Sequence, residues 1–68
     1  MKDWVCIYTS KNLPGAEIIK KLLSFNEINS VVINKQDSSY RFGDVEVYVN
    51  RDDVVKAKFV LKENNTSS

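Results

Sequence analysis

The segment from Asp44 to Asn50, DVEVYVN, has the clearest periodicity in the chain. Valine occupies every second position, and Glu46 and Tyr48 lie between the valines. Successive side chains of an extended strand point to opposite faces of a sheet. This alternation therefore predicts a strand that buries its valine face and leaves the other face at least partly in water. The rest of the chain has to supply the elements that cover the valines.

Two further strands and one helix are predicted before this segment. Trp4 to Thr9, WVCIYT, and Val31 to Asn34 are rich in aromatic and β-branched residues, which are typical of strands. Between them the apolar residues recur with a helical period. The predicted inward face of this helix comprises Ala16, Ile19, Leu22 and Leu23, with Ile18 and Phe25 widening it. A polar connection, residues 35–43, joins the second strand to the third.

A second helix is predicted after the valine strand. Residues 50–53 open it with acidic side chains in the first turn, and Val54, Ala57, Val60 and Leu61 form its inward face. Val55 and Phe59 lie one turn apart and off that face, so they pack either against the first helix or against a partner. Residues 64–68 are polar and have nothing to bury. We therefore expect one domain over residues 1–63, followed by a frayed tail over residues 64–68.

The predicted order of elements is β-α-β-β-α. Short chains of this kind form a split β-α-β unit, the ferredoxin-like arrangement of the α+β class. We expect a three-stranded antiparallel sheet with both helices on one face and without the final strand of the full fold. The outer edge of the strand at Trp4–Thr9 would then be unpaired and hydrophobic, a feature that proteins usually cover. A homodimer would cover it.

Composition narrows the classes of function. The chain has 68 residues, one cysteine and no histidine, so it has no intrachain disulfide and we expect neither a metal site nor a cofactor. Its net charge of +1 lacks the basic excess of a nucleic-acid-binding domain. No apolar run is long enough to span a bilayer, and no secretory h-region is present at the N-terminus. We expect a cytoplasmic protein that binds neither nucleic acid nor membrane.

The connection after the second strand holds the candidate ligand-binding residues. Its first four residues, Asn34 to Asp37, match the N-K-x-D motif with which GTPases read guanine, but the chain has no phosphate-binding loop. The favoured interpretation is a polar strand exit whose side chains bond to the loop backbone. The alternative is a site for a small molecule or an anion. Its residues would be Asn34, Lys35, Asp37, Ser38 and Tyr40.

The aromatic residues of the strands indicate a protein interface. We predict that Trp4, Tyr8 and Tyr48 share the sheet face away from the helices, with Cys6 between them. RNA-recognition domains stack bases on such a face, but their conserved aromatic motif is absent here and Glu46 adds negative charge. Tryptophan and tyrosine are enriched at protein interfaces. The candidate interface residues are Trp4, Cys6, Tyr8, Tyr48, Val55 and Phe59.

No catalytic residues are predicted. Without a histidine, Cys6 has no Cys–His pair to activate it, and a structural cysteine is the favoured interpretation. Asp52 and Asp53 are adjacent on a helix, where neighbouring side chains diverge by about 100°, so they do not converge on one point. Their position fits the start of a helix.

The residues from Val31 to Val49, VVINKQDSSYRFGDVEVYV, with the strand WVCIYTS and the helix GAEIIKKLLSFNEI before them, resemble a known family. It is a family of small bacterial domains of unknown function described as "putative prokaryotic signal transducing protein". The resemblance covers about Trp4 to Leu61. It implies a ferredoxin-like βαββα fold that is distantly similar to the nitrogen-regulatory PII proteins, and it implies no activity.

The sequence therefore predicts a small, non-enzymatic regulatory or protein-interaction module. Its partner would be a second copy of the chain or another protein. The alternative is a sensor of small molecules or anions that uses the connection over residues 34–43.

Overall fold

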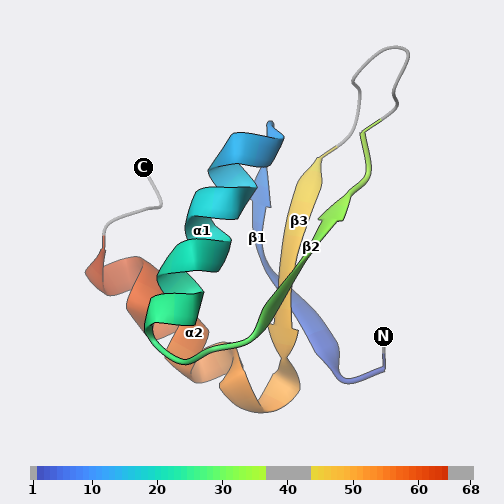
Figure 1. Cartoon of the computed structure of the whole chain (residues 1–68). Coiled ribbons are helices and arrows are strands. Elements are labelled where there is room, and N and C mark those ends of the chain that lie inside the picture. Colours follow the sequence, from blue (N-terminus) through green and yellow to red (C-terminus); the bar gives the residue numbers. More distant parts are fainter. Residues whose placement is uncertain (1, 37–43, 65–68) are drawn as a thin grey trace.

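A computed structural model describes residues 2–36 and 44–64 (Figure 1). Its elements are β1 (Trp4–Ser10), α1 (Leu13–Phe25), β2 (Ser30–Asn34), β3 (Val45–Asn50), a single 3-10 turn η1 (Arg51–Asp53) and α2 (Val54–Glu63). This order confirms the predicted β-α-β-β-α arrangement. Residues 37–43, most of the predicted polar connection, lie outside the described part of the chain.

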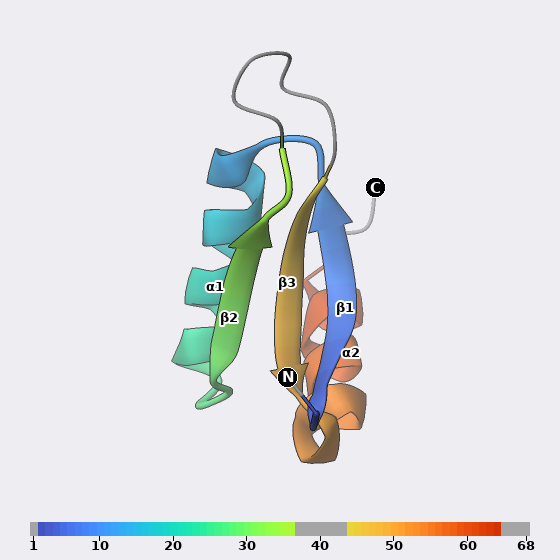
Figure 2. The same ribbon diagram turned by 90° about the vertical axis from the view of Figure 1, so that its right-hand side faces the viewer.

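The three strands form an antiparallel sheet in the order β1-β3-β2. The valine strand is thus the central strand, with a partner on each side. Figure 2 shows the sheet in front of both helices, with α1 behind β2 and α2 behind β1. This arrangement confirms the α+β, ferredoxin-like fold with both helices on one face. Within the described residues, β1 and β2 are both edge strands.

The ends of α1 are set by local hydrogen bonds. Asn12 is the N-cap, and its side-chain oxygen accepts a hydrogen bond from the backbone N–H of Gly15 at 2.8 Å. At the other end Glu27 adopts a left-handed conformation with φ of 60°. The backbone N–H groups of Glu27 and Ile28 bond to the carbonyls of Ser24 and Leu23, which is the Schellman arrangement. This turn directs Ile28 back into the core.

The core lies between the sheet and the two helices. Its buried residues are Ala16, Ile19, Leu23, Ile28, Val45, Val47, Val49, Ala57, Val60 and Leu61. The predicted inward faces of both helices are confirmed, with Leu22 and Val54 partly buried beside the core. The width predicted for α1 is wrong, because Ile18 is 64% exposed and Phe25 is 89% exposed. At 100° per residue, these two side chains lie about 130–150° around the helix from its buried residues.

A β-bulge in β1 changes the face on which Tyr8 lies. Cys6 is paired with Tyr48 and Tyr8 is paired with Val47, so Ile7 is an additional residue in β1. Directly opposed residues of an antiparallel pair share a face, and Val47 faces the helices. Tyr8 therefore packs against the core. The prediction that Tyr8 shares a face with Trp4 and Tyr48 is wrong because simple alternation does not hold across a bulge.

The second helix begins later than predicted. Asn50 caps the turn η1, its side-chain oxygen accepting a hydrogen bond from the N–H of Asp52 at 3.0 Å, and α2 follows from Val54. Val55 is 82% exposed and Phe59 is 52% exposed. Neither side chain is therefore part of the buried core between the helices and the sheet.

We expect Leu23→Ala to lower the free energy of unfolding by about 2–5 kcal/mol, because Leu23 is completely buried and its removal leaves a cavity. Phe25→Ala on the same helix should change it by less than about 0.5 kcal/mol, because its side chain lies in solvent. Urea unfolding, followed by circular dichroism, measures both. Equal losses for the two variants would contradict the described orientation of α1.

We expect Glu27→Gly to raise the free energy of unfolding by up to about 1 kcal/mol. A left-handed conformation costs a residue with a β-carbon about 1–2 kcal/mol, and glycine avoids this cost, although its greater freedom in the unfolded chain offsets part of the gain. Glu17→Gly, in the interior of α1, is the matched control and should be destabilising. A Glu27→Gly variant that unfolds at a lower urea concentration than the wild type would contradict the positive φ.

Candidate functional site

The sheet face opposite the helices is the candidate functional site. Because Val45, Val47 and Val49 face the helices, Glu46 and Tyr48 point to the other side. Their direct partners on the neighbouring strands share that side. Asn50 continues the same alternation, so its partner Trp4 lies on that side too. Of the residues on this side, we call the half-buried set Trp4, Cys6, Val31, Ile33, Glu46 and Tyr48 the open sheet face. Both helices lie behind the sheet in Figure 2 and leave this face uncovered.

The open sheet face is a continuous layer of mixed aromatic and aliphatic side chains. Cys6 and Val31 lie on either side of Tyr48, and Ile33 lies beside Glu46. All six residues are half-buried, although no helix covers them, so each is shielded by its neighbours on the sheet. Such a layer presents aromatic area at a low cost in conformational entropy, which is typical of protein-binding surfaces.

Three polar residues, Lys35, Glu46 and Tyr48, interact at this face, and we call them the polar trio. The Glu46 carboxylate accepts a hydrogen bond from the Tyr48 hydroxyl at 2.7 Å, and its Oε1 atom lies 3.1 Å from Nζ of Lys35. The hydrogen bond from Tyr48, with the contact from Lys35, holds the pKa of Glu46 below its ordinary value of 4.5. Glu46 in turn raises the pKa values of Tyr48 and Lys35, mainly through the same hydrogen bonds. The charges of Lys35 and Glu46 are thus balanced within the face.

The Cys6 thiol is bonded within its own strand. It donates a hydrogen bond to the backbone carbonyl of Tyr8, with 3.6 Å between Sγ and the oxygen. A reactive cysteine needs a neighbouring base, a cation or a helix N-terminus that stabilises its thiolate. The contact of Cys6 is with its own strand, which is consistent with its interpretation as a structural residue of the face.

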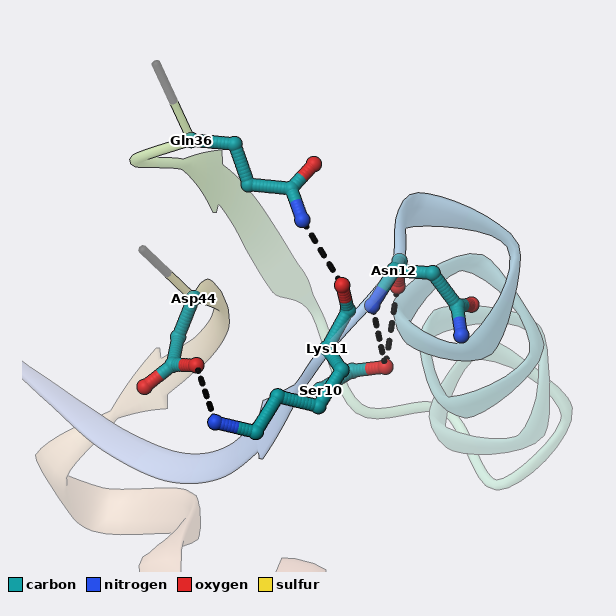
Figure 3. A network of polar contacts seen from close by, with 5 residues as sticks. All are labelled: Ser10, Lys11, Asn12, Gln36 and Asp44. Atoms are coloured by element: carbon teal, nitrogen blue, oxygen red, sulfur yellow. Dashed lines mark hydrogen bonds and ion pairs between the residues drawn. The ribbon is translucent and has the colours of Figure 1, made fainter. Parts of the chain in front are cut away.

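A second polar cluster closes the end of the sheet from which the connection after β2 leaves (Figure 3). The side chain of Gln36 donates to the backbone carbonyl of Lys11 at 2.7 Å, and the Lys11 ammonium lies 3.4 Å from the Asp44 carboxylate. The backbone N–H of Lys35 also bonds to the carbonyl of Asp44. These contacts tie the two ends of the connection to the start of α1.

The candidate ligand-binding residues are only partly placed by the structure. The Asn34 side chain accepts a hydrogen bond from the N–H of Gln36 at 2.9 Å, as expected for a polar strand exit. Lys35 contacts Glu46, on the open sheet face. Asp37, Ser38 and Tyr40 lie outside the described residues. The two residues that are described are therefore engaged in contacts within the chain.

Over residues 2–36 and 44–64, no three residues of the types that ligate metals come together. Neither α1 nor α2 is long and apolar enough to cross a membrane.

Sequence reasoning missed Val31 and Ile33 as members of the open sheet face. In the run VVI all three residues are apolar, so alternation does not distinguish the two faces of this strand. Only the register with β3, in which Val31 faces Tyr48 and Ile33 faces Glu46, assigns them. The contact between Lys35 and Glu46 depends on the same register.

Residues 4–65 match the model of the family described as "Putative prokaryotic signal transducing protein". The chain belongs to this family. The description names signal transduction and no enzymatic activity. Neither the curated proteins nor the solved structures contain a match to the chain.

We expect the Glu46 carboxyl to titrate below its ordinary pKa of 4.5 in a carbon-detected NMR titration. Tyr48→Phe should raise this pKa toward 4.5, and Lys35→Met should raise it less, because the tyrosine hydrogen bond contributes most. Since the folded pKa is the lower one, the stabilisation is present above pH 4.5 and is lost as the pH falls through the folded value. A wild-type Glu46 that titrates at 4.5 would show that the trio does not persist in solution.

Proposed function

We propose that the chain is a non-enzymatic interaction module of signal transduction that binds a second copy of itself through the open sheet face. The observation that supports this proposal is a half-buried aromatic and aliphatic layer that neither helix covers. In an isolated domain, water would contact Trp4, Tyr48 and Ile33 on one side. Association would remove this apolar area from water, which is the main driving force of protein–protein binding.

The electrostatics of the face favour a protein partner of neutral character. Glu46 and Lys35 balance one another, so the face attracts neither the phosphates of a nucleic acid nor a strongly charged ligand. Two copies stacked through neutral faces avoid like-charge repulsion, which would be severe if Glu46 were unpaired. Because of the polar trio, the face has no net charge that would repel the same face of a second copy.

The size of the face indicates a weak and exchangeable contact. Three strands spaced about 4.8 Å apart, with about 3.4 Å per residue along each, form a surface of roughly 14 by 20 Å. This area is below the roughly 800 Å² that each partner buries in a standard stable interface. An association of this size responds readily to concentration, as a signalling module requires.

The face is a better candidate for self-association than the outer edge of β1. Edge-to-edge pairing needs a regular strand, and the bulge at Ile7 interrupts the regular repeat of β1. Bulges of this kind are a common means of protecting an edge strand from pairing. The homodimer expected from the sequence is therefore proposed here with a different contact surface.

The alternative function, a sensor that uses residues 34–43, has less support. The side chains of Asn34 and Lys35 are held by Gln36 and Glu46, and a ligand would have to compete with these contacts. Both contacts are local or solvent-exposed, so this competition disfavours a ligand without preventing its binding. The open sheet face has no such competing contacts for its apolar residues.

We expect Trp4→Ala and Tyr48→Ala each to weaken self-association at least about tenfold, because tryptophan and tyrosine are among the residues that contribute most to such interfaces. Analytical ultracentrifugation over a wide range of protein concentrations measures the dissociation constant. Circular dichroism of each variant verifies that it remains folded.

Phe25→Ala is the matched control, because it removes an exposed aromatic side chain from the opposite side of the molecule. It should leave the dissociation constant unchanged. A wild-type chain that stays monomeric at every concentration would overturn the proposed self-association. An effect of Phe25→Ala equal to that of Trp4→Ala would assign the interface to the helices instead.

A further inference from the structure

The solvent side of the two helices carries most of the large apolar side chains that the described chain exposes. Ile18 and Phe25 lie seven residues apart on α1, and Val55 and Phe59 lie four apart on α2, so each pair shares a helix face. The two helices contact one another on the same side of the sheet (Figure 1). Four exposed apolar residues of this size on two adjacent helices exceed the scattered exposure that needs no explanation.

The same two helices concentrate the positive charge of the protein. They contain five lysines and two glutamates, a net charge of +3. The whole chain carries +1, so its remaining residues together carry −2. Charge is thus segregated between the helix layer and the rest of the molecule. We define the outer helix surface by six exposed residues: Ile18, Lys21, Phe25, Val55, Phe59 and Lys62.

One part of this surface is hollowed. A shallow depression near the end of α1 is lined by Lys21, Ser24 and Phe25. It brings an ammonium group, a hydroxyl and an aromatic ring to one place. An ammonium beside an aromatic ring suits a partner side chain that is both apolar and close to a carboxylate.

We infer that the outer helix surface binds an acidic protein segment in which carboxylates alternate with large apolar side chains. The apolar residues of the segment would pack on Phe25 and Phe59, and its carboxylates would contact Lys21 and Lys62. This inference rests on the proposed function and adds a second partner on the opposite side of the molecule. Self-association through the sheet would leave the outer helix surface free for this segment.

An anionic membrane is the other class of partner for a basic and apolar surface, and the structure favours it less. Membrane-binding helices gather their apolar side chains into one face with the lysines beside it. Here Lys21 lies between Ile18 and Phe25 on α1, and it lines the depression together with Phe25. A cation set between apolar side chains suits a peptide whose carboxylates alternate with apolar groups better than the continuous apolar interior of a bilayer.

The test uses two synthetic helical peptides of equal length. In the first, glutamates alternate with leucine and phenylalanine at helical spacing, and in the second every glutamate is replaced by glutamine. Proton–nitrogen NMR spectra of the full chain, recorded during titration, should show shifts at Lys21, Ser24, Phe25 and Phe59 with the acidic peptide. The glutamine peptide should bind at least about threefold more weakly. The affinity for the acidic peptide should fall as salt is raised.

Variants separate the two surfaces. Phe25→Ala and Phe59→Ala should weaken binding of the acidic peptide at least about tenfold. Lys21→Glu should weaken it more than Lys2→Glu, which makes the same change of charge at an exposed lysine outside the helices. Trp4→Ala should leave the peptide affinity unchanged. The fluorescence of Trp4, the single tryptophan, should also stay constant during the titration.

Three outcomes would overturn the inference. The first is the absence of NMR shifts at the helices with the acidic peptide, and the second is equal binding of the two peptides. The third is binding to vesicles of phosphatidylserine and phosphatidylcholine, lost in Phe25→Ala, without binding to either peptide, which would assign the surface to a membrane. If Trp4→Ala and Tyr48→Ala left the dissociation constant of self-association unchanged while the peptide experiments gave the expected results, the proposed self-association would be contradicted. The inference about the outer helix surface would still hold.

Discussion

Burial of the valine face of β3 is the interaction on which the rest of the structure depends. Val45, Val47 and Val49 are completely buried, and they lie on the central strand, where both edge strands pair and both helices pack. A chain of this length buries a limited share of its surface. Without a disulfide, its stability depends on this one layer of apolar contacts.

A two-layer structure with a single core leaves two outer surfaces that differ in chemistry. The open sheet face is aromatic, aliphatic and electrically balanced, whereas the outer helix surface is basic and bears four large, exposed apolar side chains. Exposed apolar atoms are normal on the surface of a small domain. Here the two apolar surfaces also differ from one another in charge. The two interactions that we propose use these two surfaces separately.

The polar trio shows how one buried face influences the opposite one. Tyr48 and Glu46 lie between the valines in sequence, so burial of the valines places both on the open sheet face. Pairing with β2 in a fixed register brings Lys35 to Glu46. A one-residue slip of β3 against both of its neighbours would bury Glu46 among the core residues, at a high cost in desolvation. The trio and the core therefore favour the same pairing of strands.

The sequence by itself determined the order of elements, the fold class and most of the core. The alternation of DVEVYVN and the helical period of the α2 residues are local signals, and local backbone geometry is sufficient to read them. The same signals placed Trp4, Cys6 and Tyr48 on the open sheet face. The family resemblance was likewise carried by the sequence and is confirmed over residues 4–65.

Only the tertiary structure decided which apolar residues are left outside and how the strands are aligned. Phe25 and Ile18 were predicted to widen the inward face of α1, but they point away from its buried residues to a side that neither the sheet nor α2 covers, so both remain in solvent. Tyr8 changed faces because a bulge in β1 adds one residue, and a bulge depends on pairing with β3. The register of β2 with β3 places Val31, Ile33 and Lys35 at the site. Pairing and packing involve residues distant in sequence, and a local pattern does not contain that information.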